Sequence, residues 1–515
     1  MEILEKRIHK IIARISEVAD FRRIASEALR GEIDTVVSGL SGSARALFIA
    51  GLWQFLRRPL IVVTPQDRGV EALRTDVAYF HGELNSNGAE RVCPFPAWET
   101  DPYAGLTPHA DIQQTRATTL WRLRSQRVDI VIGSIRSLAS RLVSPSQFDT
   151  YGLHVAIGDD LSQDLLIEHL KSAGYLRQEP VGAPGEFSVR GGIVDIFSPL
   201  MRNPVRIEFF GDSVDSIREF DLDDQRSRGP VQHIDILPMQ DVVVSREMLR
   251  DWGARARERW RDEAFEKDLN DKLVFADAGE FFTGVPYLIS IVQPMEATLF
   301  DYAEPAVLIL DEPEVLEETY GKFFSALEQR FQQTTNAGGV ALPPEEIFLS
   351  PQAVLARASA KRRVHLEELG ASGSSFFVRG QPPERFHGRI KEMAAAVGQS
   401  HQAGRDVVLL GSTLGMAERL RDILHEYGVP FRCEFGEQPL KTIAGGDDRS
   451  VPIVGIGKIS SGLRLPDAGL EIYAETDIFD KWLSGSTTGS DLGSHLTTTA
   501  VLQALAESVF DNGRQ

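Results

Sequence analysis

The pattern of apolar and polar positions predicts alternating strands and helices over the first 150 residues. Apolar residues at near-helical spacing predict one helix over residues 2–30, ending at Gly31. Short apolar runs predict strands at Ala46–Ala50, Leu60–Thr64, Arg91–Phe95 and Val128–Gly133. Helical patterns lie between or after these runs, at Gln113–Leu123 and Ile135–Leu142. Strands that alternate with helices indicate an α/β fold with a parallel sheet and crossover helices.

The pattern changes near residue 150 to strict alternation of apolar and polar positions. The stretches EFSVRGGIVDIFSP and NPVRIEFFGDSVDSIREFD alternate in this way, and turn residues separate them. Such alternation is typical of antiparallel strands with one face toward solvent. We therefore expect a separate, small β-rich domain inserted into the α/β body.

The pattern returns to mixed α/β after the insert. A buried strand is predicted at Ala306–Leu310, and residues 246–272 form an arginine-rich helical pattern. A further strand, Asp406–Gly411, lies between helices near Ile390–Val397 and Met416–Tyr427. The predicted organisation is a split α/β domain (1–150 and 231–377), the β-rich insert (151–230), a small α/β domain (378–480) and a flexible Ser/Thr/Gly-rich tail with a short helix at Ala500–Phe510 (481–515).

Charge and cysteine content exclude several classes of function. The 515 residues carry a formal net charge of −19, which excludes a chain that coats nucleic acid through bulk positive charge. The two cysteines, Cys93 and Cys433, form no CxxC pair, so no zinc ribbon or other metal site is expected. The charged N-terminus and the lack of long apolar runs predict a cytoplasmic protein without membrane contact.

A degenerate phosphate loop lies at Gly39–Ala46. A functional loop follows the pattern G-x-x-x-x-G-K-[ST], in which the lysine binds phosphates and the hydroxyl binds Mg²⁺. Gly39 matches the first glycine and Gly42 adds backbone freedom, but the last three required positions are Ala44, Arg45 and Ala46. We expect a loop that keeps its turn and has lost nucleotide binding.

The apolar run at 306–310 ends in Asp311 and Glu312, which resembles a Walker B strand. In an active site such acids would hold Mg²⁺ and activate water. The alternative is a strand end whose acids face solvent, and we favour it because the matching loop is degenerate.

Arginine and aromatic side chains are interleaved in the insert. They are residue types that dominate protein interfaces, and arginine also binds DNA phosphates. Between Arg177 and Arg228 there are 7 arginines against 10 acidic residues, which disfavours DNA. Strand edges with solvated charges are the alternative. The arginine-rich helix around Arg255–Arg261 is interleaved with acids, which favours a salt-bridged face over a phosphate contact.

Several segments, in order, resemble one family of bacterial proteins. Residues 186–221 resemble a segment shared by the bacterial transcription-repair coupling factors and the excision-repair helicase UvrB. FPAWETDPYAGLTPHADIQQTRATTLWRL (95–123), QPPERFHGRI (381–390) and GLRLPDAGLEIYAETDIF (462–479) resemble the coupling factors themselves. The resemblance covers about residues 1–480. It implies a UvrB-like split body in which Gly39–Ala46 and Asp311–Glu312 are remnants of a nucleotide site without ATPase activity.

The resemblance also implies a function in transcription-coupled nucleotide excision repair. The insert would dock UvrA, with Arg190 as the central anchor, since Arg190 matches the second arginine of the F-R-V-R-G pattern while Ser188 replaces the first. The weaker candidates for this contact are Phe187, Arg177 and Arg206. Full-length members of the family would bind RNA polymerase and DNA through further domains, which we do not find in this sequence. The ATP and Mg²⁺ of their translocase motor would also bind to those domains. We therefore expect a fragment that acts as an adaptor without a cofactor. The alternatives are a UvrB-like nucleotide-dependent helicase subunit and a direct DNA-backbone binder.

Overall fold

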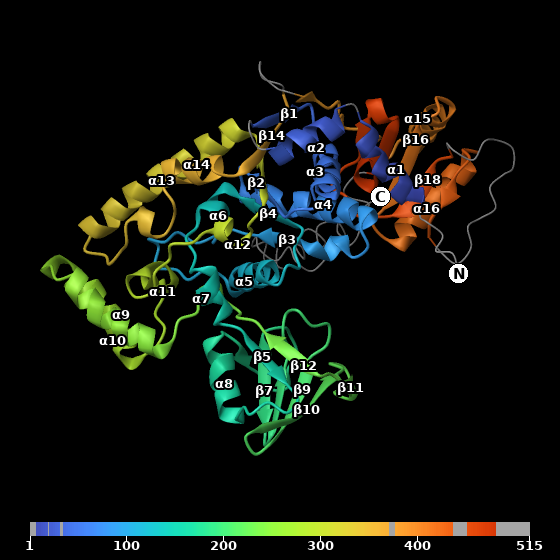
Figure 1. Ribbon diagram of the computed structural model, residues 1–515. Helices are drawn as coiled ribbons and strands as arrows, with labels where there is room; N and C mark the ends of the chain where they lie inside the picture. Colours follow the sequence, from blue (N-terminus) through green and yellow to red (C-terminus); the bar gives the residue numbers. More distant parts are fainter. Residues whose placement is uncertain (1–6, 19, 31–33, 370–375, 436–450, 480–515) are drawn as a thin grey trace, which may run out of the picture.

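The computed structural model describes residues 7–18, 20–30, 34–369, 376–435 and 451–479 (Figure 1). Its largest sheet has seven strands, and every neighbouring pair in it is parallel. In spatial order these are β15 (Phe376–Phe377), β1 (Thr35–Ser38), β14 (Arg362–Glu367), β13 (Val307–Asp311), β2 (Leu60–Thr64), β4 (Ile130–Ser134) and β3 (Val92–Phe95). The chain leaves this sheet after β4 and re-enters it at β13, which confirms the predicted split α/β body.

Helices cover both faces of this sheet and extend from it as an arm (Figure 1). Before the insert they are α1 (Arg7–Ala13), α2 (Phe21–Arg30), α3 (Ser43–Leu56), α4 (Val70–Leu84), α5 (Ala110–Arg124), α6 (Ile135–Ala139) and α7 (Pro145–Asp149). After it they are α9 (Arg246–Arg259), α10 (Glu266–Ala278), α11 (Val285–Leu288), α12 (Leu299–Tyr302), α13 (Pro313–Asn336) and α14 (Pro351–Ser359). None of the helices in the described part of the chain is long and apolar enough to cross a membrane.

Three local predictions are wrong. The strand expected at Ala46–Ala50 is the middle of α3, a helix that is buried on nearly all sides, and a short apolar run does not distinguish such a helix from a buried strand. The helix expected over residues 2–30 is interrupted between α1 and α2, where Asp20 has a φ of +66°. The arginine-rich pattern forms two helices, α9 and α10, because the side chain of Asp262 accepts from Ala264 N and caps a new helical turn.

The insert forms a six-stranded sheet with its own apolar core, as the alternation predicted. All strand pairs are antiparallel except that of the edge strand β6 with β7. The strands are β11 (Ser227–Pro230), β10 (Ser213–Phe220), β9 (Val205–Phe210), β8 (Ile193–Ile196), β7 (Glu186–Arg190) and β6 (Leu176–Arg177), and the helix beside them is α8 (Gln163–Ser172). A two-stranded ribbon, β5 (Leu153–Ala156) with β12 (His233–Ile236), joins the insert to the body (Figure 1).

A buried ion pair lies where the insert returns to the body. Arg116 on α5 and Asp241 are both fully buried, and Arg116 Nε lies 2.5 Å from Asp241 Oδ2. The other guanidinium nitrogens of Arg116 donate to Pro96 O and Ser140 Oγ. Because both charges are desolvated, loss of either partner would leave a buried unpaired charge. This pair therefore fixes the base of the insert.

The carboxyl-terminal domain has a five-stranded sheet that is parallel except at one edge. In order its strands are β17 (Arg432–Cys433), β18 (Ile453–Ile456), β16 (Asp406–Gly411), β20 (Leu470–Ala474) and β19 (Leu463–Leu465). Its helices are α15 (Ile390–Gln402), α16 (Leu414–Glu426) and α17 (Glu475–Ile478). This domain packs against the body beside α1, α3 and α4 (Figure 1). The tail and the helix predicted at Ala500–Phe510 lie outside the described residues.

Candidate functional site

The remnant phosphate loop, Gly39–Ala46, keeps the backbone turn of a phosphate-binding loop. It connects β1 to the start of α3, and Gly39 and Gly42 have φ values of +86° and +52°. A Cβ on Gly39 would lie 2.7 Å from both the Phe377 ring and Val378 O, so only glycine fits there. Gly380 N donates to Gly39 O, at 2.9 Å, which further holds the loop against the following segment.

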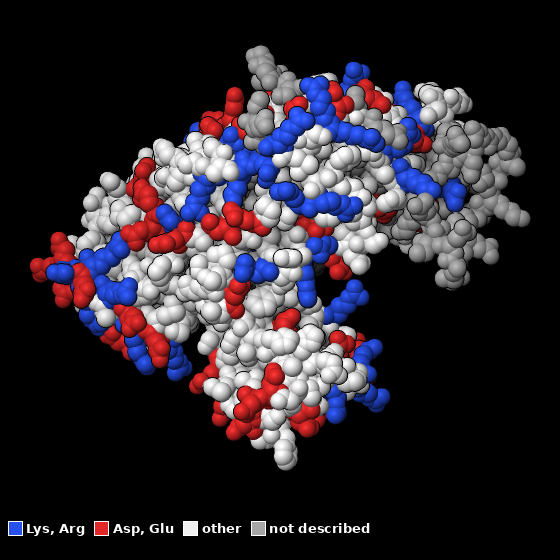
Figure 2. Space-filling model, viewed as in Figure 1, with Lys and Arg blue, Asp and Glu red and all other residues white. Residues whose placement is uncertain are grey.

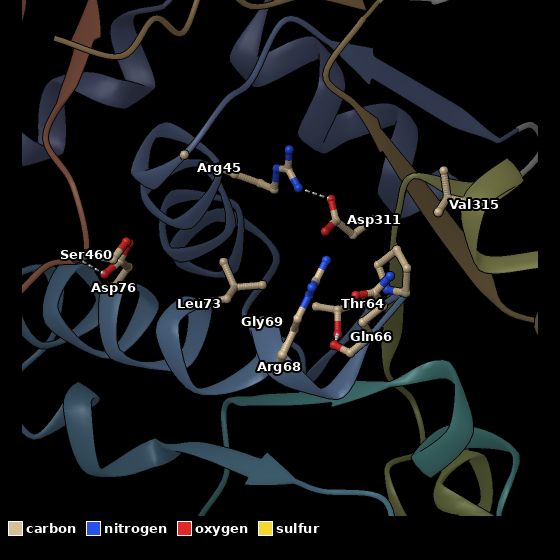
Figure 3. Close-up of a pocket in the computed structure, with 12 residues that line it drawn as sticks. Arg45, Thr64, Gln66, Arg68, Gly69, Leu73, Asp76, Asp311, Val315 and Ser460 are labelled. Carbon is tan, nitrogen blue, oxygen red and sulfur yellow. Dashed lines mark hydrogen bonds and ion pairs between the residues drawn. The ribbon is translucent and has the colours of Figure 1, made fainter. Parts of the chain in front are cut away.

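Arg45 occupies the place of the catalytic lysine and is bound to the acid of the β13 strand end. Its guanidinium donates to Asp311 Oδ1 (Figure 3). Arg45 Nη2 also lies 3.9 Å from Glu312 Oε1. Burial raises the pKa of Asp311 to about 6, although Arg45 acts in the opposite direction. The expectation that these acids face solvent is therefore wrong for Asp311, which is buried in an ion pair.

The residues present do not fit ATP with Mg²⁺. Ala44 and Ala46 are fully buried, and Ala46 brings no hydroxyl at the position that binds Mg²⁺ in a functional loop; the Ser43 hydroxyl lies instead against Asp76. Asp311, which would hold the metal, is instead paired with a cation of the chain itself. A cavity of about 380 Å³ remains, and Gly42, Arg45 and Asp311 line it.

The structure adds residues to this cavity that sequence reasoning missed. Arg68, Asp76 on α4 and Ser460 from the carboxyl-terminal domain also line it (Figure 3). Asp76 is buried, and burial raises its pKa while hydrogen bonds from Ser43 and Ser460 act against that shift. No motif links these positions, because Asp76 and Ser460 lie far apart in the sequence and meet only through the packing of two domains.

In the insert, Arg190 lies on the outer face of the β-sheet, away from its apolar core. Phe187 and Val189 pack into the core, whereas Ser188 and Arg190 alternate onto the other face. Phe187 is fully buried, so its ring packs the core and does not reach a partner. The prediction that Phe187 contacts UvrA is therefore wrong, and Phe187 instead packs the core of the insert.

Arg206 also lies on this outer face but is bound within the sheet. It faces Asp195 across the β8–β9 pair, and its Nε and Nη2 lie 2.7 Å and 2.9 Å from the two carboxylate oxygens. Its guanidinium also lies over the Phe220 ring, 4.9 Å from the centroid. Because Asp195 is buried, this bidentate pair stabilises the sheet, and we leave Arg206 out of the docking face proposed below.

The remaining candidates, Arg190 and Arg177, are exposed. Arg190 Nε lies 2.9 Å from Glu179 Oε1, and both side chains reach solvent. Arg177 is exposed on the edge strand β6 and has no ion-pair partner among the residues that the structure describes. These two arginines are thus available to a partner.

Two exposed apolar side chains extend this surface; Phe210 is one of the aromatic residues interleaved with arginine in the insert, whereas sequence reasoning missed Leu176. Leu176, next to Arg177, is 69% exposed, and Phe210 is 83% exposed. Phe209 N donates to Gly192 O, which brings Phe210 to the end of the sheet where β7 turns after Arg190. The docking face is hereafter Leu176, Arg190 and Phe210; Arg177 pairs with Phe187, so it lies on the opposite side of the sheet and stays a separate, exposed candidate.

The arginine-rich helix has no free arginine between 255 and 261. Two of these side chains donate to backbone carbonyls and two pair with acids: Arg255 with Ile291 O, Arg261 with Glu258 O, Arg257 with Asp277 and Arg259 with Glu346. This arrangement supports the salt-bridged interpretation of the helix. On the face in Figure 2, positive and negative side chains are interspersed over α9 and α10.

Comparison with known proteins supports the resemblance found in the sequence. Residues 153–241 match the family described as the UvrB interaction domain. The chain is 27% identical over 490 residues to the transcription-repair-coupling factor of Myxococcus xanthus, covering 89% of this chain and 40% of that protein. It is 26% identical over 486 residues to the one from Bacillus subtilis (90% and 40%) and 29% identical over 331 residues to the one from Haemophilus influenzae (64% and 28%).

The chain therefore spans two fifths or less of the length of these relatives. Among solved structures, Xpd4 from S. tokodaii aligns with a TM-score of 0.19 and 9% identity, covering 85% of this chain and 80% of that chain, and carries no argument. The insert is similar to the UvrB interaction domain, and nearly the whole chain is similar to transcription-repair-coupling factors.

Proposed function

We propose that this chain is an adaptor in transcription-coupled nucleotide excision repair that binds UvrA through the docking face of its insert. The observation that carries the proposal is the match of residues 153–241 to the UvrB interaction domain. The similarity of nearly the whole chain to transcription-repair-coupling factors supports the link to stalled RNA polymerase. The proposal for this chain is limited to UvrA binding. Binding of polymerase and DNA and ATP-driven translocation are proposed only for a protein with the full length of a transcription-repair-coupling factor.

The chemistry of the docking face suits a protein partner. It combines the exposed Arg190 with two exposed apolar side chains, Leu176 and Phe210. Arginine and aromatic residues supply most of the binding energy in protein interfaces, and an arginine paired only at the surface exchanges partners readily. Figure 2 shows acidic side chains on the insert as well, which would repel a nucleic-acid backbone.

The test is a calorimetric titration of the whole chain with UvrA from the same organism. Arg190→Ala is expected to weaken binding by about 1–3 kcal/mol, the range for a charged interface hydrogen bond lost on truncation. The matched control is Arg226→Ala, because Arg226 is exposed on the same insert, near the opposite sheet edge. No binding by the intact chain, or equal losses in the two variants, would overturn the assignment.

We further propose that the remnant phosphate loop does not hydrolyse ATP. The pairing of Arg45 with Asp311 and the buried Ala46 support this. Equilibrium dialysis with labelled ATP and Mg²⁺ tests it, and saturable micromolar binding would instead favour a helicase-type function. For the DNA-binding alternative, the paired state of the arginine-rich helix predicts no steeply salt-dependent duplex binding.

A further inference from the structure

The start of α3 and the carboxyl-terminal domain meet at a buried carboxylate. Asp76 Oδ2 lies 2.6 Å from Ser43 Oγ, which belongs to the remnant phosphate loop. From the carboxyl-terminal domain, Ser460 N lies 2.6 Å from Asp76 Oδ1, and Ser460 Oγ lies 2.6 Å from Asp76 Oδ2. Three polar groups from two domains thus converge on one carboxylate, and Figure 3 shows Ser460 beside Asp76.

The phosphate-loop serine also contacts the carboxyl-terminal domain directly. Ser43 Oγ lies 2.6 Å from Ser461 O and 3.3 Å from Ser461 Oγ, and its single proton is donated to either the Asp76 carboxylate or Ser461 O. A Cβ placed on Gly42 would lie 3.2 Å from Ser461 Oγ, so the loop backbone itself touches the other domain. In this way loop 457–462 lies at the site of the remnant phosphate loop. The interdomain clasp is hereafter Ser43, Asp76, Ser460 and Ser461.

An apolar seam next to the interdomain clasp fixes the same arrangement. A Cβ on Gly457 would lie 2.3 Å from the Tyr79 ring, and one on Gly455 would lie 2.5 Å from Ile8 Cδ1. These glycines let α1 and α4 approach β18 more closely than any side chain would allow. One buried apolar core continues from the body into the carboxyl-terminal sheet, through residues such as Ile453 and Ile472.

We infer that the remnant phosphate loop works as a permanent interdomain clasp, which holds the body and the carboxyl-terminal domain together without a nucleotide. The buried carboxylate is stabilised only while all its donors are in place, since an unsatisfied buried acceptor is unfavourable. The clasp supplies those donors from both sides of the domain boundary. Directional hydrogen bonds set the register of the two domains, whereas the apolar seam alone is non-directional. This inference does not depend on UvrA binding.

Hydrogen exchange of the whole chain tests the interdomain clasp. In the wild type, the hydrogen-bonded amides of 457–462 (Gly457, Ser460 and Gly462) are expected to be protected, and addition of ATP with Mg²⁺ is expected to leave their exchange unchanged. Asp76→Asn should speed their exchange by roughly tenfold or more, because hydrogen bonds to a charged group are lost, while amides of β2 and β13 in the body sheet stay as protected as before.

Two further variants keep the result decisive. Ser460→Ala removes one donor and should speed exchange of the same segment, and it serves if Asp76→Asn fails to fold. Asp67→Asn is the matched control, because Asp67 accepts hydrogen bonds from Ser134 and Arg136 within the body alone. Exchange of 457–462 that is unchanged in both clasp variants, or that changes when ATP and Mg²⁺ are added to the wild type, would overturn the inference.

Discussion

The remnant nucleotide site and the docking face are both centred on an arginine, and they differ in exposure to water. In the first, the side chains of Arg45 and Asp311 are 16% and 9% exposed. In the second, those of Arg190 and Glu179 are 48% and 61% exposed. A partly buried pair cannot exchange its partner without leaving a desolvated charge, whereas an exposed pair can. Burial therefore makes one arginine part of the fold and leaves the other available for recognition.

Within this comparison, the largest effect is expected at the more buried arginine, Arg45. Arg45→Ala should lower the free energy of unfolding by about 3 kcal/mol at pH 7, because Asp311 would remain buried next to Glu312 without its cation. Urea denaturation measures this. Arg68→Ala is the matched control, since Arg68 lines the same cavity but is exposed, and it should change stability by about 0.5 kcal/mol or less. Equal losses in both variants would contradict the comparison.

Arg206 separates the effect of burial from the effect of location, because it shares the sheet face of Arg190 but is bound to buried Asp195. Arg206→Ala should destabilise the insert by about 2 kcal/mol and leave the UvrA affinity of the folded chain unchanged. Thermal unfolding and calorimetry measure the two quantities. Arg218→Ala, directly across the β9–β10 pair and largely exposed, is the control and should be nearly neutral. Weaker UvrA binding by folded Arg206→Ala would return Arg206 to the docking face.

The pH dependence of stability should report on Asp311. Its pKa of about 6 in the folded chain exceeds the ordinary value of 3.8. The folded state therefore binds the proton more tightly, and this contribution to stability is present below pH 4 and is lost as the pH rises through 6. Between pH 4 and pH 7, the free energy of unfolding of the wild type should therefore fall by about 1–3 kcal/mol more than that of Asp311→Asn, which has no titrating group at this position. Urea denaturation of both proteins across this pH range measures the difference. A constant difference across this range would contradict the assignment.

The sequence predicted what depends on local pattern and missed what depends on packing. Alternation identified the insert, and the degenerate motif identified Gly39–Ala46, because both signals lie in consecutive residues. The helix at Ala46–Ala50 was mistaken for a strand because its burial comes from neighbours distant in sequence. Asp76 and Ser460 carry no motif, and the roles of Phe187 and Arg206 depend on which sheet face and which partner they meet.

The smallest effect concerns the exposed pair itself. Glu179 holds Arg190 in a contact that a partner's carboxylate would have to displace, so Glu179→Gln should raise UvrA affinity by about twofold to fivefold, the range for a surface ion pair. Calorimetry at low and high salt measures this, and the gain should shrink at high salt because the pair is screened. In the Arg190→Ala background the same substitution should have no effect, since there is no cation left to release. A gain that persists without Arg190 would mean that Glu179 repels the partner directly, and the exposed pair would then have no part in controlling the docking face.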